Sequence, residues 1–400
     1  MDTQVKKKIL AISFLFPNCN QLYHGVFVLN RLKAMSKYAD ITVINPIPDS
    51  PLHGFIDKFS ALRSVPAQEE LEGLTIHHPR FLSIPGGLKA IEISTYKRAV
   101  ERVIKKVGMD FDLVDLHWTF PDLPTGYYLS QKYRVPFNIT LRGMEAFHFQ
   151  DHDIRQKTVA KYLRKANHVI SLSNEMAIAA DKIAHTAQRT TVIRNGVDTE
   201  QFNYLDKAMC REKLGLDQTQ KIVLGVGALI KRKGFDLVIS GLNDIISTQG
   251  LESTKFYILG AQGPEGDYRK ELDQFIEQQN LQRHVVFIGA VANSELIKWY
   301  NAADVFCLSS RGEGSPNVLT EALACGTPAV ATNVGSVPEI MASETDLGFC
   351  VENENQEEIT NKLIQVLQKS YDNKRQAANF SKYTWDWCAL KVMNVIQKRT

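Results

Sequence analysis

The chain has 400 residues, a length that usually divides into two domains of about 200 residues each. Hydrophobic residues make up 44% and charged residues 23% of the sequence, as in soluble globular proteins, and the net charge of +3 is too small to indicate a nucleic-acid partner. The six cysteines lie far apart without a C-x-x-C pair, which argues against a disulfide framework and predicts reduced thiols in a cytoplasmic protein.

The first predicted element is a buried strand over residues 9–16. This uninterrupted apolar run is typical of a strand that is covered on both faces of a parallel sheet. With Lys6 to Lys8 before it, the segment also imitates a signal peptide, but it stops at Pro17 and no small-residue cleavage site follows. No run approaches the ~18 apolar residues of a membrane-spanning helix. We therefore expect a cytoplasmic protein that begins with a strand.

A loop over residues 17–25 and an amphipathic helix over 26–38 follow this strand. The loop places Gly25 at the turn into the helix. A strand, a glycine-bearing loop and a helix in this order are typical of the phosphate-facing start of a nucleotide-binding unit. We further predict strands over residues 41–45, 75–81, 111–116, 137–141, 168–172 and 191–193, helices over 88–107 and 174–183, and a surface excursion over 49–73.

The predicted helix over residues 88–107 carries lysines and arginines along its polar side. This pattern has two interpretations. The basic side is either a solvated face or a surface that is drawn to anionic lipid.

Polar residues follow two of these strands directly. Because ligands of open parallel sheets bind beyond the carboxyl ends of the strands, His117, Arg142 and Glu145 are candidates for a site. A histidine at a strand end is by itself more often structural, and Arg142 either faces a phosphate or an acidic acceptor or pairs with Glu145. The segment His148 to Asp153 has metal-ligand residue types, but its spacing fits no standard cage. We interpret it as a polar helix entry.

The second half repeats the alternation of strands and helices after a predicted link over residues 206–220. Strands are predicted over 221–226, 255–259, 285–288, 305–308 and 349–351, and helices over 235–246, 357–368 and 383–399. The loop after the first of these strands carries three cations, Lys231, Arg232 and Lys233. No G-x-G-x-x-G stands between a strand and a helix, which argues against a dinucleotide fingerprint.

Two glutamates, Glu313 and Glu321, lie on either side of a predicted helix start, with seven residues between them. Gly312 and Gly314 allow a ligand to approach the backbone, Ser315 is the predicted N-cap, and Pro316 the first helical residue. Gly326 is the predicted left-handed stop. A helix N-terminus binds anions, and carboxylates accept hydrogen bonds from hydroxyls, so the pair suits a ligand with phosphates and sugars. A capped surface helix with two solvated glutamates is the alternative.

The string E-G-S-P-N-V-L-T-E-A-L-A-C-G-T-P-A-V-A-T (residues 313–332) resembles the Glu-x7-Glu signature of retaining glycosyltransferases of family 4, which have the GT-B fold. The resemblance extends through V-I-R-N-G-V-D (192–198), V-G-A-L-I-K-R-K-G (226–234) and Y-N-A-A-D-V-F (300–306). It implies an α/β protein of two Rossmann-like domains that face a cleft. The implied ranges are 1–205 for the acceptor side, 206–375 for the nucleotide sugar, and 376–400 for a helix that crosses back to the first domain, where Trp385 and Trp387 would pack at the junction.

The resemblance also implies roles for single residues. Lys233 would oppose the charge of the departing diphosphate, Glu321 would hold the ribose, and Glu313 with the backbone around Gly314 would hold the hexose, which His117 would contact from the other domain. The remaining implied donor contacts are Gly25, Lys231, Arg232, Gly289, Val291, Ser315, Pro316, Asn317 and Val318. GT-B enzymes have no D-x-D metal site, so we expect no metal and no cofactor.

Four positions in three segments depart from the family pattern. Ala228 stands where the family usually has an arginine, for which Lys231 or Arg232 would compensate. Asp115 stands where the family has the first histidine of its H-x-H-W-like segment. Arg142 and Glu145 replace the histidine and aspartate of an H-G-x-D segment.

The sequence thus predicts a cytoplasmic hexosyltransferase, with peripheral contact at the inner membrane face as a further option. Its donor would be a UDP- or GDP-sugar, and its acceptor a saccharide or a lipid-linked acceptor in polysaccharide or glycolipid assembly, with retention of anomeric configuration. Two alternatives stay open at this point: a catalytically silent sugar-nucleotide-binding protein, and a Rossmann-type oxidoreductase that binds a nicotinamide.

Overall fold

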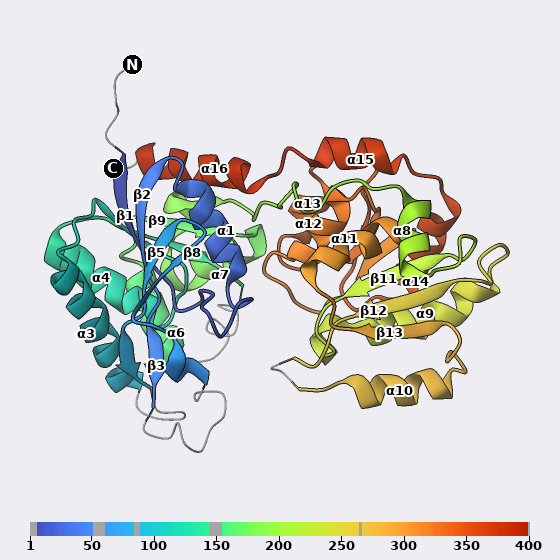
Figure 1. Ribbon diagram of the computed structural model, residues 1–400, viewed down its shortest axis with the longest axis horizontal. Helices are drawn as coiled ribbons and strands as arrows, with labels where there is room; N and C mark the ends of the chain where they lie inside the picture. The colour runs from blue at the N-terminus through green and yellow to red at the C-terminus, as the bar shows by residue number, and fades with distance from the viewer. Residues whose placement is uncertain (1–5, 51–60, 84–88, 144–153, 264–265, 399–400) are drawn as a thin grey trace. The chain divides into compact units, whose positions relative to one another are not determined.

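The computed structural model describes residues 6–50, 61–83, 89–143, 154–263 and 266–398, and the chain forms two compact α/β units (Figure 1). The first unit comprises residues 1–195 and 385–400, and the second comprises residues 196–384. The sequence-based division lies after residue 205. In the structure the chain enters the second unit at Gly196, because the Val197 N–H donates to the carbonyl of Tyr383, and because Val197 and Phe202 are buried in the second unit's core.

The first unit is built on an eight-stranded sheet with the order β10-β9-β8-β7-β1-β2-β5-β4, in which only the edge strand β4 is antiparallel. Its strands are β1 (Lys7–Ile12), β2 (Ala39–Ile44), β4 (Gln68–Leu71), β5 (Leu74–His77), β7 (Leu113–Leu116), β8 (Phe137–Leu141), β9 (His168–Ser171) and β10 (Thr190–Val192), and β3 (Ile47–Asp49) pairs with β6 (Arg80–Leu82) in a separate small sheet. Its helices are α1 (Val26–Met35), α3 (Lys89–Val107), α4 (Asp122–Tyr133), α6 (Ile154–Leu163), α7 (Asn174–Ala184) and α16 (Trp385–Lys398), with short 3-10 turns at Ala61–Ser64 and Ala187–Arg189.

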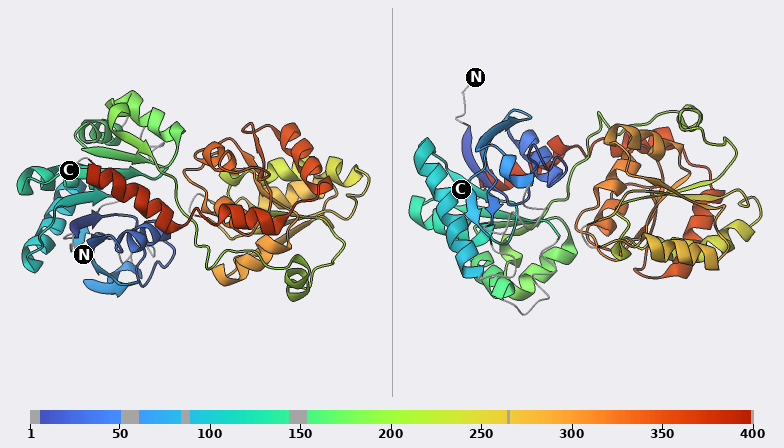
Figure 2. Two further views of the ribbon diagram at one scale, coloured as in Figure 1. Left: turned by 90° about the horizontal axis from the view of Figure 1, so that it is seen from above. Right: turned by 60° about the horizontal axis from the view of Figure 1, so that its bottom comes forward.

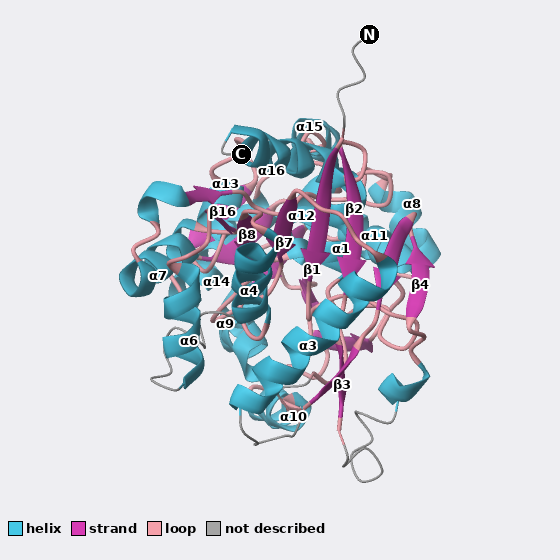
Figure 3. Ribbon diagram, turned by 90° about the vertical axis from the view of Figure 1, so that its left-hand side faces the viewer, coloured by secondary structure: helices cyan, strands magenta, loops and turns pink. Residues whose placement is uncertain are grey.

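Helices cover both faces of this sheet, as the continuous apolar strands predict. Leu10 and Ile12 of β1 belong to the core that includes residues of α3, α4, α6 and α7, whereas Ile9 and Ala11 belong to the core that includes residues of α1 and α16. Helices α3 and α4 lie in front of the strands of this unit in Figure 3. The C-terminal helix α16 therefore belongs to the first unit, as predicted, and it lies along that unit in the left view of Figure 2. Residues 376–384, which the prediction placed with this helix, belong to the second unit.

The two tryptophans of α16 pack inside the first unit. Trp385 and Trp387 are half-buried against the core that α1 and α16 share, and the guanidinium of Arg194 lies 5.4 Å from the centre of the Trp387 ring.

The second unit is a six-stranded, fully parallel sheet with the order β13-β12-β11-β14-β15-β16. The strands are β11 (Ile222–Val226), β12 (Lys255–Leu259), β13 (Val285–Gly289), β14 (Val305–Leu308), β15 (Ala329–Thr332) and β16 (Gly348–Val351). The helices are α8 (Lys207–Leu214), α9 (Phe235–Ser247), α10 (Arg269–Gln278), α11 (Asn293–Ala302), α12 (Asn317–Ala324), α13 (Val337–Met341), α14 (Gln356–Gln368) and α15 (Asn373–Phe380), with a 3-10 turn at Lys231–Lys233. This is the Rossmann strand order, whose direction reverses between β11 and β14, and ligands of such sheets bind at that switch point.

Several predicted elements differ from the observed ones. The strand predicted over residues 9–16 ends at Ile12, because the Ser13 side chain turns to donate to the Leu15 carbonyl. The strand predicted over 75–81 is two strands, β5 and β6, since Pro79 between them cannot donate to a ladder.

Two stretches predicted as connections contain regular structure. The surface excursion holds β4, while residues 51–60 lie outside the described ones, and the link over 206–220 holds α8, whose N-cap Asp206 accepts from the Met209 N–H. Helix α15 is an additional element that no periodicity predicted. Throughout the described ranges, none of the helices combines the length and apolar character needed to cross a bilayer.

Candidate active site

Two loops of the second unit interlock at the switch point of its sheet. One follows β11 (residues 227–234) and the other follows β14 (residues 309–316). The Arg311 N–H donates to the Arg232 carbonyl at 2.7 Å, and the Ser309 hydroxyl donates to the Lys233 carbonyl at 3.1 Å. Gly234 has a φ of 65°, and a Cβ on it would lie only 1.9 Å from the backbone carbonyl oxygen of Ser309, so only glycine permits this close approach of the two loops.

Interlocking brings Lys233 and Glu313 into contact. The Lys233 Nζ lies 2.6 Å from Glu313 Oε1, and the Ser310 hydroxyl donates to the same oxygen at 2.8 Å. Arg232 lies beside this pair, since its guanidinium donates to the Gly312 carbonyl at 2.9 Å and lies 3.8 Å from Glu313 Oε2. The structure thus joins a cation and a carboxylate that lie 80 residues apart in the sequence.

The three cations of the first loop differ in position. Lys231 is exposed, whereas Arg232 and Lys233 are half-buried. Of the two predicted substitutes for the arginine missing at Ala228, Arg232 is therefore the one that lies beside Glu313.

An arginine that sequence reasoning missed ties the two loops together. Arg311 donates to both carboxylate oxygens of Asp236, at 2.9 and 2.7 Å, and also to the Lys231 carbonyl and to Glu354. Such a bidentate pair fixes orientation as well as distance. Its only sequence signal is its position directly before the Glu-x7-Glu stretch.

Helix α12 begins one residue later than predicted. Pro316, not Ser315, is its N-cap, because Pro316 has an extended ψ of 103° and its carbonyl accepts the Leu319 N–H at 3.2 Å. The helix then presents Asn317 and Val318 in its first turn. Its end is as predicted, because Gly326 has a φ of 82° and a Cβ there would lie 2.0 Å from the Asn373 carbonyl oxygen.

The second glutamate is held by a tyrosine. The Tyr300 hydroxyl on α11 donates to Glu321 Oε2 at 2.9 Å. Burial raises the pKa of Glu321 to about 7, and the bond from Tyr300 opposes this rise. Tyr300 was part of the motif Y-N-A-A-D-V-F, but nothing in that string predicted its contact with Glu321.

Gly335, Gly289 and Val291 lie at other strand ends of the same sheet. Gly335 has a φ of 55°, and its close approach lets the neighbouring Ser336 N–H donate to the Gly314 carbonyl at 3.0 Å. Gly289 ends β13 with a φ of 87° and accepts from the Gly260 N–H, while Val291 packs half-buried against the core.

In the first unit, Gly25 forms the turn into α1 as expected. It is the N-cap of the helix with a φ of 78°, and a Cβ there would lie 2.7 Å from the Leu15 carbonyl carbon and oxygen. Any larger residue would push the loop away from β1.

His117 lies in a fully buried polar cluster at the carboxyl end of β7. Its Nδ1 is 2.8 Å from a guanidinium nitrogen of Arg142, and its Nε2 is 3.2 Å from Asp115 Oδ2. Burial lowers the pKa of His117; Asp115 opposes the shift, and the charges of Arg142 and Arg31 reinforce it. Glu145, which was one of two alternative partners for Arg142, and the segment His148 to Asp153 lie outside the described residues.

Arg31 completes this cluster, and sequence reasoning did not find it. The side chain is completely buried; its guanidinium donates to the Thr140 hydroxyl at 3.2 Å and to Asn195 Oδ1 at 3.3 Å, an oxygen that also accepts from Arg142 at 3.3 Å. A charged residue among the apolar positions of a helix gives no signal that it turns inward.

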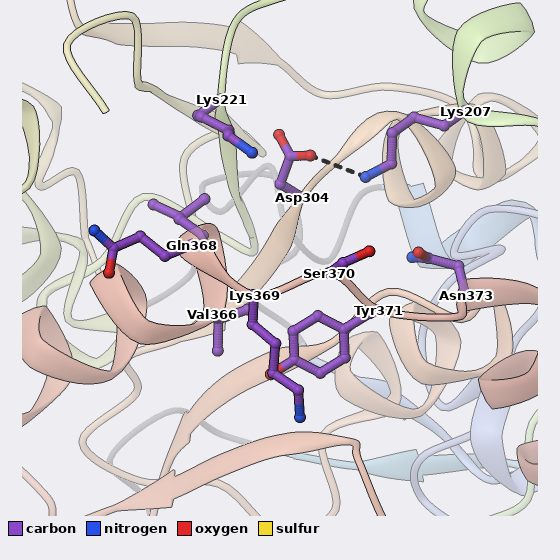
Figure 4. Close-up of a pocket in the computed structure, with 10 residues that line it drawn as sticks. Lys207, Lys221, Asp304, Val366, Gln368, Lys369, Ser370, Tyr371 and Asn373 are labelled. Atoms are coloured by element: carbon purple, nitrogen blue, oxygen red, sulfur yellow. Dashed lines mark hydrogen bonds and ion pairs between the residues drawn. The ribbon is translucent and has the colours of Figure 1, made fainter. Parts of the chain in front are cut away.

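A pocket of about 280 Å³ in the second unit contains none of the predicted site residues (Figure 4). It is lined by Lys221, which precedes β11, and by Asp304, which precedes β14, so it lies at the amino ends of the strands, opposite the interlocked loops. Lys207 pairs with Asp304 at 2.9 Å, and Lys369 follows the C-terminal end of α14, where a cation complements the helix dipole. These lysines have structural explanations. The described residues also contain no group of three or more His, Cys, Asp or Glu that could hold a metal ion.

Comparisons with known proteins agree with this arrangement. Residues 58–201 match the profile described as Glycosyltransferase Family 4, and residues 206–385 match that described as Glycosyl transferases group 1. The putative teichuronic acid biosynthesis glycosyltransferase TuaC of Bacillus subtilis is 27% identical over 350 residues, which cover 85% of this chain and 84% of TuaC. The lipopolysaccharide core biosynthesis mannosyltransferase LpsB of Rhizobium meliloti is 30% identical over 46% of this chain and 50% of its own.

Solved structures match over almost the whole chain. Sucrose-phosphate synthase from Thermosynechococcus elongatus has a TM-score of 0.78 at 19% identity and covers 98% of this chain and 99% of its own. HepE from Anabaena, in complex with UDP, has a TM-score of 0.73 at 19% identity, and the match covers 98% of this chain and 100% of the HepE chain. With the two-unit architecture and the Glu-x7-Glu loop in place, the chain belongs to the group 1, family 4 glycosyltransferases and has the GT-B fold.

Proposed function

We propose that this glycosyltransferase moves a hexosyl group from a UDP- or GDP-sugar to a saccharide or lipid-linked acceptor, with retention of anomeric configuration. The observation that carries the proposal is the contact of Lys233 with Glu313 beside the start of α12. Glu321 lies four residues after Asn317 on the same helix, and Tyr300 of α11 donates to it. A cation, helix N–H groups and two carboxylates suit the phosphates and hydroxyls of one sugar nucleotide.

On the donor side, binding would exchange partners inside the loops. The diphosphate accepts hydrogen bonds from Lys233 and from the neighbouring Arg232. Lys233 then leaves the Glu313 carboxylate, which accepts hydrogen bonds from the hexose hydroxyls instead. As the bond to the sugar breaks, negative charge grows on the diphosphate, and Lys233 with the N–H groups of Asn317 and Val318 opposes it. Stabilisation of this kind by groups already in place is usually the largest contribution to catalysis.

The nucleoside end of the donor would lie toward Glu321 and Gly289. Glu321 accepts from the ribose hydroxyls, and the turn from Gly289 to Val291 receives the base. Support for a nucleoside diphosphate comes from HepE, whose structure holds UDP.

From the first unit, Gly25 would border the donor phosphates and His117 the hexose, with Arg142 on the acceptor side. Support for an acceptor in polysaccharide or glycolipid assembly comes from the names of two relatives, one for teichuronic acid and one for the lipopolysaccharide core. Peripheral membrane contact through α3 is supported by its basic residues and by the exposed Ile91 and Val107 at its two ends.

No step of this reaction requires a metal or an organic cofactor. We expect transfer to continue in EDTA, and the product anomer, read from the proton spectrum, to match the donor anomer.

The experiment that tests the donor assignment is a calorimetric titration of the protein with UDP, GDP and their 2′,3′-dideoxy forms. Removing a hydrogen bond to a charged group costs roughly 1.5–3 kcal/mol, so Glu321→Ala should weaken binding of the ribonucleotide by about 10- to 100-fold. It should leave binding of the dideoxy form unchanged, as should the exposed control Glu277→Ala for both. Equal weakening of both nucleotides would contradict the assignment of Glu321 to the ribose.

The catalytically silent alternative rests on Ala228 and Asp115, the two departures at positions where the family has an arginine and a histidine. It predicts tight nucleotide binding with neither sugar transfer nor donor hydrolysis. Release of nucleoside diphosphate from a bound donor, at a rate that falls in Lys233→Met, would exclude it.

A further inference from the structure

The buried cluster at the carboxyl end of β7 determines which nitrogen of His117 carries its proton. We infer that Arg142 and Asp115 hold His117 as a neutral imidazole with the proton on Nε2, and that Asp115 is a positioning residue for this ring.

Arginine determines the role of His117 Nδ1. A guanidinium has five N–H donors, no acceptor, and stays charged in proteins. The Arg142 nitrogen that lies 2.8 Å from His117 Nδ1 can therefore only donate, and Nδ1 must present its lone pair. In a neutral imidazole the proton is then on Nε2.

Asp115 lies near the other ring nitrogen, Nε2. Residues two apart at a strand end point to the same side, so Asp115 and His117 share one face of β7. Nε2 lies 3.2 Å from Asp115 Oδ2, but neither carboxylate oxygen nor Nε2 makes a hydrogen bond of normal geometry in the structure. The carboxylate is thus the nearest acceptor for the Nε2 proton, and both side chains are buried, with exposed fractions of 1% and 0%.

The charged groups around the ring decide its protonation. Among the residues that the structure describes, three charged side chains face His117: Arg142 after β8, Arg31 on α1, and Asp115 on β7 itself. Two of them are cations, and the burial of the site further disfavours a charged ring. Asp115 alone favours an imidazolium, so the ring stays neutral only while Arg142 occupies the Nδ1 side.

The consequence for turnover rests on the proposed function. The lone pair of Nδ1 accepts from Arg142, and Nε2 carries the proton. The ring therefore has no free lone pair and acts as a hydrogen-bond donor through Nε2, not as a base. Asp115 would thus hold the His117 ring from the position where the family has another histidine.

The test reads the proton directly and needs neither donor nor acceptor. Histidine imidazoles of the ¹⁵N-labelled full-length protein are observed in two-bond ¹H–¹⁵N correlation spectra, with His117 assigned by His117→Gln. We expect the neutral Nε2–H pattern, unchanged across about pH 5 to 8, where a free histidine titrates. An Nδ1–H pattern, or titration of His117 in this range, would overturn the inference.

Variants then separate the two partners. Arg142→Met removes the donor and the charge at Nδ1, so His117 should titrate at a higher pH than in the wild type. Arg142→Lys, which keeps both, should preserve the wild-type pattern. Adding Asp115→Asn to Arg142→Met should return the ring to its neutral form, because the carboxylate that favours the cation is gone. If the single and double variants titrate alike, Asp115 has no positioning role.

Folding and function are checked separately. If Arg142→Met does not give the circular dichroism of the wild type, the same comparison is made with Arg142→Gln, whose amide can donate but is uncharged. Asp115→Asn should lower kcat about tenfold while leaving the Kd for nucleoside diphosphate unchanged. If the wild-type protein shows the inferred tautomer but no transferase activity, the proposed function fails and the inference about His117 stands.

Discussion

The polar residues at the carboxyl ends of the two sheets are held in different ways. In the first unit, Arg31, His117 and Arg142 are buried, and the two guanidinium groups donate to protein groups such as Thr140 and Asn195. In the second unit, Lys233 and Glu313 keep 15% and 11% of their side chains exposed and pair mainly with each other. A ligand can replace partners in the second arrangement more easily than in the first. The first cluster is thus suited to hold a fixed geometry, and the second to exchange its contacts when a substrate binds.

The largest expected effect comes from removing the cation of the second unit. Lys233→Met should lower kcat by about 10²- to 10³-fold, the usual cost of losing one preorganised group that opposes developing charge. Steady-state kinetics with the preferred donor measures this loss. Lys221→Met, at the opposite end of β11, is the matched control and should behave as the wild type. Equal rates for Lys233→Met and the wild type would mean that the pair with Glu313 is only structural.

The next effect concerns pH and Glu321. Its folded pKa of about 7 lies above the ordinary value of 4.5, so the folded state binds more protons than the unfolded state between these values. The stability linked to this group is present below about pH 4.5 and is lost as pH rises through about 7, by an amount on the order of 3 kcal/mol. Relative to Glu321→Gln, the unfolding free energy of the wild type should fall over this range. Nucleotide affinity should rise over it in the wild type and stay flat in the variant; parallel pH curves for both proteins would exclude the shift.

A change in the buried cluster should affect stability and spare nucleotide binding. Asn195→Leu takes the acceptor from two guanidinium groups, Arg31 and Arg142, and should destabilise the first unit by about 2 kcal/mol or more. Urea unfolding followed by tryptophan fluorescence of α16 measures this loss, while calorimetry with nucleoside diphosphate should show the wild-type Kd. The exposed Asn361→Leu is the control. If Asn195→Leu lost nucleotide binding but kept the wild-type stability, the cluster of the first unit would serve ligand binding and not a fixed geometry.

The smallest expected effect concerns the hydrogen bond from Tyr300 to Glu321. Tyr300→Phe removes one donor to the carboxylate and should weaken nucleotide binding by about three- to tenfold at neutral pH. Since that bond lowers the pKa of Glu321, the pH dependence of binding should move to higher pH. Tyr257→Phe removes another buried tyrosine hydroxyl, 3.4 Å from Gln220, and should leave both unchanged. An unaltered pH profile in Tyr300→Phe would show that Tyr300 does not control Glu321.

Local patterns in the sequence determined much of the architecture. Short segments rich in apolar residues, such as Phe137–Leu141 and Lys255–Leu259, became strands over the predicted ranges, because a strand that is covered on both faces needs apolar residues on both. Gly25 and Gly326 took the left-handed conformations that their positions required. The Glu-x7-Glu stretch also identified the second-unit loop that carries the charged site. These features depend on neighbours in the chain, and a sequence displays such neighbours directly.

Only the tertiary structure decided which side chains meet. Arg31 turns inward to Thr140 and Asn195, Tyr300 reaches Glu321, and Arg311 bridges to Asp236, each across residues that are distant in the sequence or on another element. Periodicity shows that a residue lies on a helix or strand, but a long polar side chain chooses its partner only when the folded chain brings donors and acceptors within about 3 Å. For this reason the sequence located the strand ends where the site lies, and the fold determined the hydrogen bonds and charges within it.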